Sequence, residues 1–177
     1  MSEGVGEAAG NEGSEAGEEV DRRGRIEFVR VLLAGGSCAL ELGRVERLVA
    51  DPEITRVPRS SPVIAGITAV GGDIAPVVDG RTLLGPSSRA PDDAPTLLLL
   101  DRGDGTRAAG LLVDEVAGIE TYHVDRVTPV AGSGDRQPWV DREWCRAVVA
   151  PDADGRPIGV LDPRTVLETA AERSHSP

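Results

Sequence analysis

The two histidines, His123 and His175, are the side chains best suited to acid–base chemistry or metal binding near neutral pH. His175 falls within the last three residues, and His123 follows Tyr122 in a segment that we predict to be a turn. Neither histidine has Cys, His or carboxylate neighbours at the spacing of a metal site. The sequence therefore predicts no metal ion and no cofactor.

Nucleophilic and general acid–base catalysis have equally little support. The sequence contains no Gly-x-Ser-x-Gly motif, and a Ser-His-Asp triad would depend on His123 alone. Asp114 and Glu115 are adjacent, but neighbouring side chains of a strand point to opposite faces and cannot act together on one atom. We assign both carboxylates to a turn or a rim. We predict a binding or scaffolding protein and not an enzyme.

The cysteines and tryptophans are interpreted as structural residues. Cys38 and Cys145 lie in apolar, strand-like surroundings, so we expect two free thiols in the core, with a disulfide between them as the alternative. Trp139 and Trp144 lie near a predicted loop, where we expect them to anchor the core. A partner contact is the alternative, since tryptophan is enriched at binding hot spots.

The charge of the chain limits its partners. Of its 177 residues, 30 are acidic and 19 are basic, a formal charge of -11, and every basic residue is an arginine. A nucleic-acid partner requires a basic face, so we expect none. An acidic, lysine-free surface fits the high-salt cytoplasm of a halophilic archaeon, although a high-GC genome also favours arginine over lysine. The sequence shows no signal-peptide core and no apolar run of membrane-spanning length, so we expect a cytoplasmic protein without direct membrane insertion.

Short apolar runs separated by Gly, Pro and Asp clusters predict an all-β domain over residues 25–170. Residues 1–24 are rich in Glu, Gly and Ala, and we predict a disordered acidic tail there. The predicted strands are 26–34, 37–42, 45–49, 64–70, 74–78, 97–101, 107–113, 116–119, 144–150 and 157–162. Gly71 and Gly72 supply the tight turn that joins 64–70 to 74–78.

The remaining segments are predicted to be loops and one helix. We expect a linker near residues 85–96 and a loop over 131–138. A helix begins at Pro163, whose missing N–H is tolerated at the first helical position, and Asp162 caps it. Residues 171–177 are expected to form a flexible C-terminus.

The chain contains an internal echo in three parts. Residues 77–84, Val-Val-Asp-Gly-Arg-Thr-Leu-Leu, recur as Val-Leu-Asp-Pro-Arg-Thr-Val-Leu at 160–167, and Ile-Thr-Arg-Val at 54–57 recurs as Val-Thr-Pro-Val at 127–130. The apolar spacing of Leu40, Leu42, Val45 and Leu48 is repeated by Leu111, Val113, Val116 and Ile119. Three echoes in the same order predict two similar β subdomains made by duplication, each with an aspartate that caps a short helical turn.

Three stretches of the chain also match the sequence patterns of one known family. Residues 54–62, Ile-Thr-Arg-Val-Pro-Arg-Ser-Ser-Pro, precede Gly66 as that family's first loop precedes its first long hairpin. Residues 72–79 resemble a Gly-x-Ile-x-Pro-Val-x-Asp strand, and residues 110–118 resemble a Gly-Leu-x-Val-Asp-x-Val-x-Gly segment. Over roughly residues 25–168 the chain therefore resembles CheW, the coupling protein of bacterial and archaeal chemotaxis.

The resemblance implies an all-β fold of two interleaved, SH3-like, five-stranded β-barrel subdomains packed together, with a short C-terminal helix. It also implies a non-enzymatic adaptor in chemotaxis signal transduction. Such an adaptor couples methyl-accepting chemoreceptors to the CheA histidine kinase within membrane receptor arrays. Its partners would be the cytoplasmic tip of a chemoreceptor and the regulatory domain of the kinase.

Site residues follow from the matching positions. The receptor-binding candidates are Leu42, Val45 and Arg47. The kinase-binding candidates, on the first long hairpin, are Gly66, Gly71, Gly72 and Ile74. The alternative is structural: Leu42 and Val45 would then be core residues and the glycines turn-formers.

The chain departs from the family pattern at three places. It has Ala-Val-Gly-Gly at 69–72 where the family usually has Asn-Leu-Arg-Gly, so Gly71 replaces an arginine. Arg47 stands where the family usually has Glu, and Gly80 replaces a common Leu. These departures leave a second hypothesis open, a divergent CheW-like scaffold in another receptor–kinase pathway.

Overall fold

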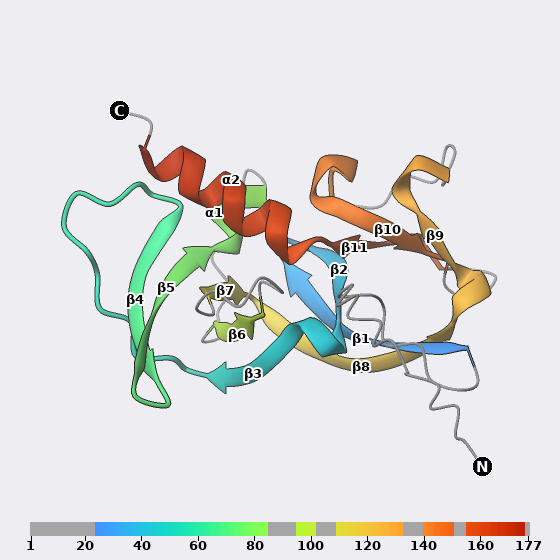
Figure 1. Cartoon of the computed structure of the whole chain (residues 1–177), viewed down its shortest axis with the longest axis horizontal. Coiled ribbons are helices and arrows are strands. Elements are labelled where there is room, and N and C mark those ends of the chain that lie inside the picture. The colour runs from blue at the N-terminus through green and yellow to red at the C-terminus, as the bar shows by residue number, and fades with distance from the viewer. Residues whose placement is uncertain (1–23, 85–94, 102–108, 133–139, 151–154, 176–177) are drawn as a thin grey trace, which may run out of the picture.

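The computed structural model describes residues 24–84, 95–101, 109–132, 140–150 and 155–175. In this part of the chain the strands form one six-stranded and one five-stranded sheet, which lie side by side (Figure 1). The predicted acidic tail, most of the 85–96 linker, most of the 131–138 loop and Trp139 lie outside the described residues.

The six-stranded sheet, sheet A, has the order β8-β1-β2-β11-β10-β9. Its strands come from both ends of the chain: β1 (Arg25–Leu33), β2 (Gly36–Glu41), β8 (Glu115–His123), β9 (Val127–Pro129), β10 (Cys145–Val149) and β11 (Ile158–Leu161). Neighbouring strands are antiparallel except β2 and β11, which are parallel. Strand β8 is longer than the predicted 116–119 because it pairs with β1 from Arg25 to Leu32. Tyr122 and His123 therefore end a strand, and the prediction that they lie in a turn was wrong.

The five-stranded sheet, sheet B, has the order β3-β6-β7-β5-β4. Its strands are β3 (Val45–Ala50), β4 (Ile64–Val70), β5 (Asp73–Asp79), β6 (Thr96–Leu100) and β7 (Ala109–Val113). Past β3 the chain continues to Thr55, which exchanges backbone hydrogen bonds of 2.8 and 2.9 Å with Ile67 of β4. In sheet A the chain continues from β8 through the 3-10 turn η2 (Val124–Arg126) to β9, which pairs with β10. Each sheet is thus curled into a barrel.

The five strands of sheet B correspond to five strands of sheet A, and the bridge at Thr55 corresponds to the sixth, β9. Each contains one parallel pair, β5 with β7 and β11 with β2. Each has a bulge at the equivalent place, after Ile64 in β4 and after Cys145 in β10. Beside these bulges the Asp79 amide donates to the Val63 carbonyl and the Asp162 amide to that of Trp144, both at 2.8 Å. The echoed stretches therefore occupy equivalent positions, and the all-β fold of two subdomains is confirmed.

The subdomains are interleaved because the chain changes sheet twice. It leaves β2 of sheet A through η1 (Leu42–Arg44) and enters β3 of sheet B. It returns from β7 of sheet B to β8 of sheet A at Asp114. Strands β1 and β2 are thereby completed by the last strands of the chain, so barrel A is built from two separate segments, and the strands of barrel B lie between these segments in the sequence.

The equivalent strands β5 and β11 are each followed by a helix capped by an aspartate, as the sequence predicted. The Asp79 Oδ1 atom accepts hydrogen bonds from the amides of Arg81 and Thr82 at 2.9 and 3.3 Å, at the start of α1 (Gly80–Leu84). The Asp162 Oδ1 atom accepts one from the Arg164 amide at 2.9 Å, at the start of α2 (Pro163–His175). Short polar side chains at this position satisfy amides that have no partner within the helix.

Helix α2 extends further than expected. We predicted a flexible C-terminus over residues 171–177, and in the structure residues 171–175 continue the helix. The Arg173 guanidinium donates to the Leu83 carbonyl of α1 at 3.1 Å and lies 5.5 Å from the centroid of the Trp144 ring. Helix α2 runs from the end of β11 toward α1 (Figure 1), so it ties the two halves of the molecule together.

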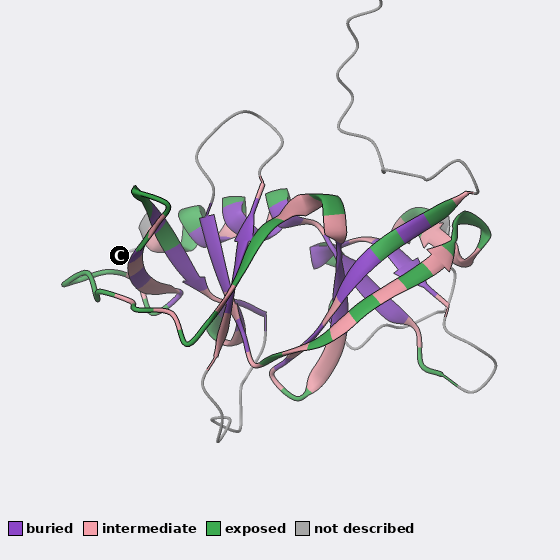
Figure 2. Ribbon diagram, turned by 90° about the horizontal axis from the view of Figure 1, so that it is seen from below, coloured by how far each residue is buried: buried purple, intermediate pink, exposed green. Residues whose placement is uncertain are grey.

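The core explains why the barrels stay together. Leu97 and Leu99 of β6 pack inside barrel B, whereas Leu98 and Leu100 join a larger apolar cluster that combines residues of both sheets and both helices. Strand β6 therefore reads as a continuous run of buried leucines, since both of its faces are covered. Phe28 similarly points into barrel A and Val29 into the shared cluster. Figure 2 shows buried positions along the strands of both halves of the molecule.

Candidate partner-binding surfaces

The receptor-binding candidates lie where the chain crosses from sheet A to sheet B. Leu42 belongs to η1, and Val45 begins β3 opposite Leu100. Both side chains are half-buried and pack against the shared cluster, whereas Arg47 is fully exposed beyond the bulge that follows Val45. Leu42 and Val45 thus contribute to the core with part of their surface and leave the rest open at the seam between the barrels.

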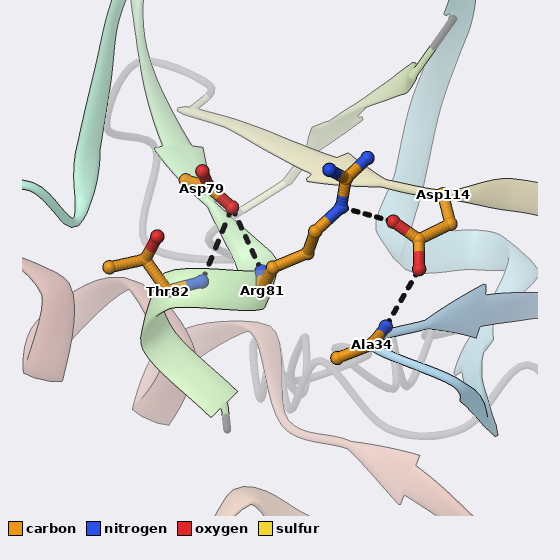
Figure 3. Close-up of polar contacts among 5 residues, drawn as sticks. All are labelled: Ala34, Asp79, Arg81, Thr82 and Asp114. Atoms are coloured by element: carbon orange, nitrogen blue, oxygen red, sulfur yellow. Dashed lines mark hydrogen bonds and ion pairs between the residues drawn. The ribbon is translucent and has the colours of Figure 1, made fainter. Parts of the chain in front are cut away.

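The second crossing between the sheets is held by Asp114. Its Oδ2 atom accepts a hydrogen bond from the Ala34 amide at 2.7 Å, in the turn between β1 and β2. Its Oδ1 atom forms an ion pair with Nε of Arg81 in α1 (Figure 3). One carboxylate therefore connects the end of β1, the β7–β8 crossing and α1. The expected turn position of Asp114 is confirmed, and its neighbour Glu115 is exposed at the start of β8.

The kinase-binding candidates lie on the β4–β5 hairpin, but they do not share one role. Gly71 and Gly72 form its tip with φ angles of 62° and 91°, and no atom lies within 4 Å of a Cβ at either position. Ile74 follows on the outer face and is 58% exposed. Gly66, in contrast, is buried at the base, where an added Cβ would lie 2.8 Å from Cγ2 of Ile54 and closer still to the Thr55 carbonyl oxygen. Its role is to let residues 54–55 approach β4.

The outer face of the β4–β5 hairpin carries exposed apolar side chains in addition to the glycines that the sequence singled out. Ala69 is directly opposite Ile74 across the hairpin, and both are exposed. Pro76 is exposed on the same face, opposite the half-buried Ile67. Ile74 and Pro76 alternate along β5 with the buried Ala75 and Val77. Because alternate residues of a strand share a face, this spacing in the sequence could have placed Ile74 and Pro76 together on the outer face.

The main titratable clusters are structural. Glu120 of β8 accepts a hydrogen bond from Arg30 at 2.9 Å and another from the Tyr122 hydroxyl. Desolvation acts to raise the pKa of Glu120, but the hydrogen bonds from Tyr122 and Arg30 outweigh it and hold that pKa below its ordinary value. The buried Glu41 carboxylate pairs with Arg146 at 2.9 Å. The Arg30–Glu120 and Glu41–Arg146 pairs connect β1 with β8 and β2 with β10 in sheet A, and sequence reasoning missed them because these partners are distant in the chain.

The cysteines have the free, buried state that the sequence predicted. Burial raises the pKa of the Cys145 thiol to about 12, and it raises that of Cys38 as well. Both thiols therefore stay protonated near neutral pH, which removes the thiolate that nucleophilic chemistry requires.

The described residues contain neither a metal-binding cluster nor a membrane-spanning helix. No group of three or more His, Cys, Asp or Glu side chains is arranged to hold a metal ion there. His123 is exposed and pairs with Asp125 at 3.0 Å. Among the described helices, none is long and apolar enough to cross a membrane.

Comparisons with known proteins agree with this architecture. The chain is 24% identical over 114 residues to the chemotaxis protein CheW of Klebsiella aerogenes, an alignment that covers 64% of this chain and 65% of the relative's length. A solved structure, the scaffolding protein TtCheW from Thermoanaerobacter tengcongensis, superposes with a TM-score of 0.68 at 22% identity and covers 81% of this chain and 92% of the other. The family model described as the CheW-like domain matches residues 27–171, which include both barrels. The chain therefore belongs to the CheW-like family.

Proposed function

We propose that this protein is a non-enzymatic adaptor that couples chemoreceptors to a CheA-type histidine kinase, at the cytoplasmic side of membrane receptor arrays. The observation that carries the proposal is the match to the CheW-like family over both barrels. An adaptor needs two separate contact surfaces. Sheet B carries two such surfaces, one at β3 and the other on the β4–β5 hairpin.

The receptor surface is assigned to the seam at Leu42, Val45 and Arg47. A receptor tip is a helical hairpin that presents apolar side chains at i, i+3, i+4 spacing, and such a face docks into apolar grooves. The exposed parts of Leu42 and Val45 supply apolar contact, and their buried parts hold them rigidly against the shared cluster. Arg47 at the margin would select a partner with a complementary charge.

The kinase surface is assigned to the hairpin tip and its outer face. Gly71 and Gly72 leave the tip free of side chains, so a partner can approach its backbone closely. Ile74 and its exposed neighbours Ala69 and Pro76 provide an apolar surface of the kind that interaction sites use. Gly66 contributes indirectly, since it keeps the hairpin seated on the barrel.

Calorimetry with a CheA regulatory domain tests the assignment. Ile74→Asp should weaken kinase binding at least about tenfold, because a carboxylate would be desolvated without a partner. Ile119→Asp is the matched control, since Ile119 is also 58% exposed but lies on β8 of the other sheet. Equal losses for the two variants would contradict the hairpin as the kinase surface.

A second variant in the same experiment tests the arginine that the family usually has at the hairpin tip. Gly71→Arg restores the side chain that the family usually has at the tip. If wild type binds the kinase domain and Gly71→Arg binds more tightly, the coupling role is supported. If neither protein binds CheA domains or receptor tip fragments, the divergent scaffold of another pathway replaces it.

A further inference from the structure

A cavity of about 500 Å³ opens in barrel B, away from the seam and from the hairpin tip. Its walls are the segment that follows Ile54, the beginning of β4, the start of α1 and Leu112 of β7. Ligand sites in proteins typically have volumes of about 300–1,000 Å³ and combine apolar walls with a few polar groups. This cavity has both, because Ile54, Ile64 and Leu112 line it together with Arg56 and Arg81.

The charge of the cavity depends on Arg56. Asp114 neutralises Arg81 through the ion pair at Nε, and the lining carboxylate of Asp79 caps α1 through Oδ1. Within the described part of the chain, Arg56 forms no ion pair or side-chain hydrogen bond. An exposed cation beside apolar walls is thus available to an anion, although the whole chain carries a charge of -11.

The segment that borders the cavity differs from its counterpart in barrel A. Thr55 pairs with Ile67 in barrel B, and Thr128 pairs with Val148 at the equivalent place in barrel A. The residues that follow the two threonines, Arg56 and Pro129, therefore correspond to each other. Val63 corresponds to Trp144, since their carbonyls accept the equivalent hydrogen bonds. The connection from Val57 to Ile64 is also eight residues shorter than that from Val130 to Cys145. In barrel A that longer connection contributes the buried side chains of Val140 and Trp144.

We propose that this cavity binds a carboxylate carried on a short aliphatic stem, of the kind that a glutamate side chain presents. The stem lies against Ile54, Ile64 and Leu112, and the carboxylate meets the Arg56 guanidinium, with the terminal nitrogens of Arg81 behind it. A guanidinium–carboxylate contact is directional and strong where solvent is partly excluded. The proposal does not depend on the coupling function, because it uses neither the seam nor the hairpin tip.

The test is a heteronuclear NMR titration of the full chain with glutarate at constant ionic strength. We expect saturable shifts of the Ser61, Ile64 and Leu112 amides in the millimolar range. Arg56→Gln should weaken glutarate binding about tenfold, the effect of losing a charge-assisted pair. Arg59→Gln should leave it unchanged, since Arg59 is exposed on the same segment but does not line the cavity. Glutaramide, the uncharged analogue, should give no saturable shifts.

Three outcomes would overturn the proposal: no saturation by glutarate, saturation by glutaramide as well, or equal weakening by the two arginine variants. A further full-length variant identifies the source of the carboxylate. It replaces Glu12, Glu15, Glu18 and Glu19 by Gln, within the Glu-rich residues 1–23. Tighter glutarate binding by this variant would support occupancy by the chain's own N-terminal segment. Unchanged binding would support a carboxylate from another molecule.

Discussion

Asp79 and Asp162 perform the same task in the two halves of the chain, and the sequence alone was sufficient to assign it. Each follows a buried strand and accepts amide hydrogen bonds at the first turn of a helix. The role of Asp114 was less accessible, because its partners, Ala34 and Arg81, are 80 and 33 residues away in the chain. Local side-chain roles are readable from sequence, whereas contacts across the fold require the topology.

The cap at α2 gives a stability prediction. Asp162→Ala should lower the free energy of unfolding by about 1 kcal/mol, since an amide at the start of the helix loses its acceptor. Urea denaturation measures the change. Glu168→Ala, which removes only an exposed pair with Arg164, should cost less than about 0.5 kcal/mol. An unchanged midpoint for Asp162→Ala would show that the hydrogen bond does not stabilise the helix, and partner binding should be unaffected in either variant.

Two glycines of the hairpin should respond differently to alanine. Gly66→Ala should destabilise by about 2–3 kcal/mol, because its Cβ would collide with residues 54–55. Gly71→Ala should cost only about 1 kcal/mol, since its positive φ is strained for alanine but its surroundings are open. Thermal unfolding of the two variants compares them. A smaller loss for Gly66→Ala than for Gly71→Ala would refute the close-approach role of Gly66.

The lowered pKa of Glu120 leads to a prediction about folding stability at acidic pH. Its pKa in the folded protein is below its ordinary value of 4.5, so its interactions stabilise the fold above about pH 4.5. That contribution is lost as pH falls from 4.5 through the lower folded pKa. Glu120→Gln should therefore show a shallower loss of stability over this range than wild type, as measured by urea unfolding at each pH. Parallel pH profiles would contradict the role of the Arg30–Glu120–Tyr122 contacts.

At the scale of elements, the strands and the first hairpin were predictable, and the reasons are local. Short apolar runs marked β4 and β5, and Gly71-Gly72 marked their turn. Strand β8 was underestimated because its exposed positions interrupt the apolar pattern, although it pairs along nearly all of β1. The C-terminal turns of α2 were missed because Arg173 is held by Leu83 and Trp144, which no local pattern reveals.

The binding surfaces were predicted less completely than the strands. The sequence placed Gly71, Gly72 and Ile74 on one hairpin, and the structure has them at its tip and outer face. It did not distinguish Gly66 from the other glycines, since only the approach of residues 54–55 does so. The cavity at Arg56 was also missed, because its lining residues come from segments that only the fold brings together.

A further prediction concerns Val45, which lies at the seam between the barrels. Val45→Asp should abolish binding of a receptor tip fragment, because the exposed part of Val45 would present a carboxylate to an apolar partner. Circular dichroism must show that the variant stays folded, since Val45 also contacts the shared cluster. If Val45→Asp unfolds the protein, its core contacts dominate and the receptor assignment rests on Leu42 and Arg47 alone.

At the scale of the whole molecule, the two barrels form one unit because they share their largest apolar cluster and a covering helix. Barrel A also combines β1–β2 with β8–β11, so the first and last strands of the chain are paired around the strands of barrel B. The seam at Leu42 and Val45 and the β4–β5 hairpin are parts of this single unit and are held in a fixed relation, which is the property that a scaffold between two partners requires.

The overall charge gives a prediction for the intact protein. With 30 acidic and 19 arginine residues, like charges repel in dilute buffer, and salt screens them within about 3 Å at 1 M. We expect the melting temperature to rise markedly from dilute buffer to molar KCl, as for a protein of a high-salt cytoplasm. Full stability in dilute buffer would contradict the halophilic hypothesis and leave codon composition as the reason for the missing lysines.

The most direct test of the adaptor function is a bridging measurement. A chemoreceptor tip fragment is immobilised, and retention of a CheA regulatory domain is measured by surface plasmon resonance with and without the intact protein. The account predicts that the kinase domain is retained only when the protein is present, and that Ile74→Asp loses the kinase but still binds the receptor fragment. Binding of the two partners that is mutually exclusive, or absent for both, would contradict it.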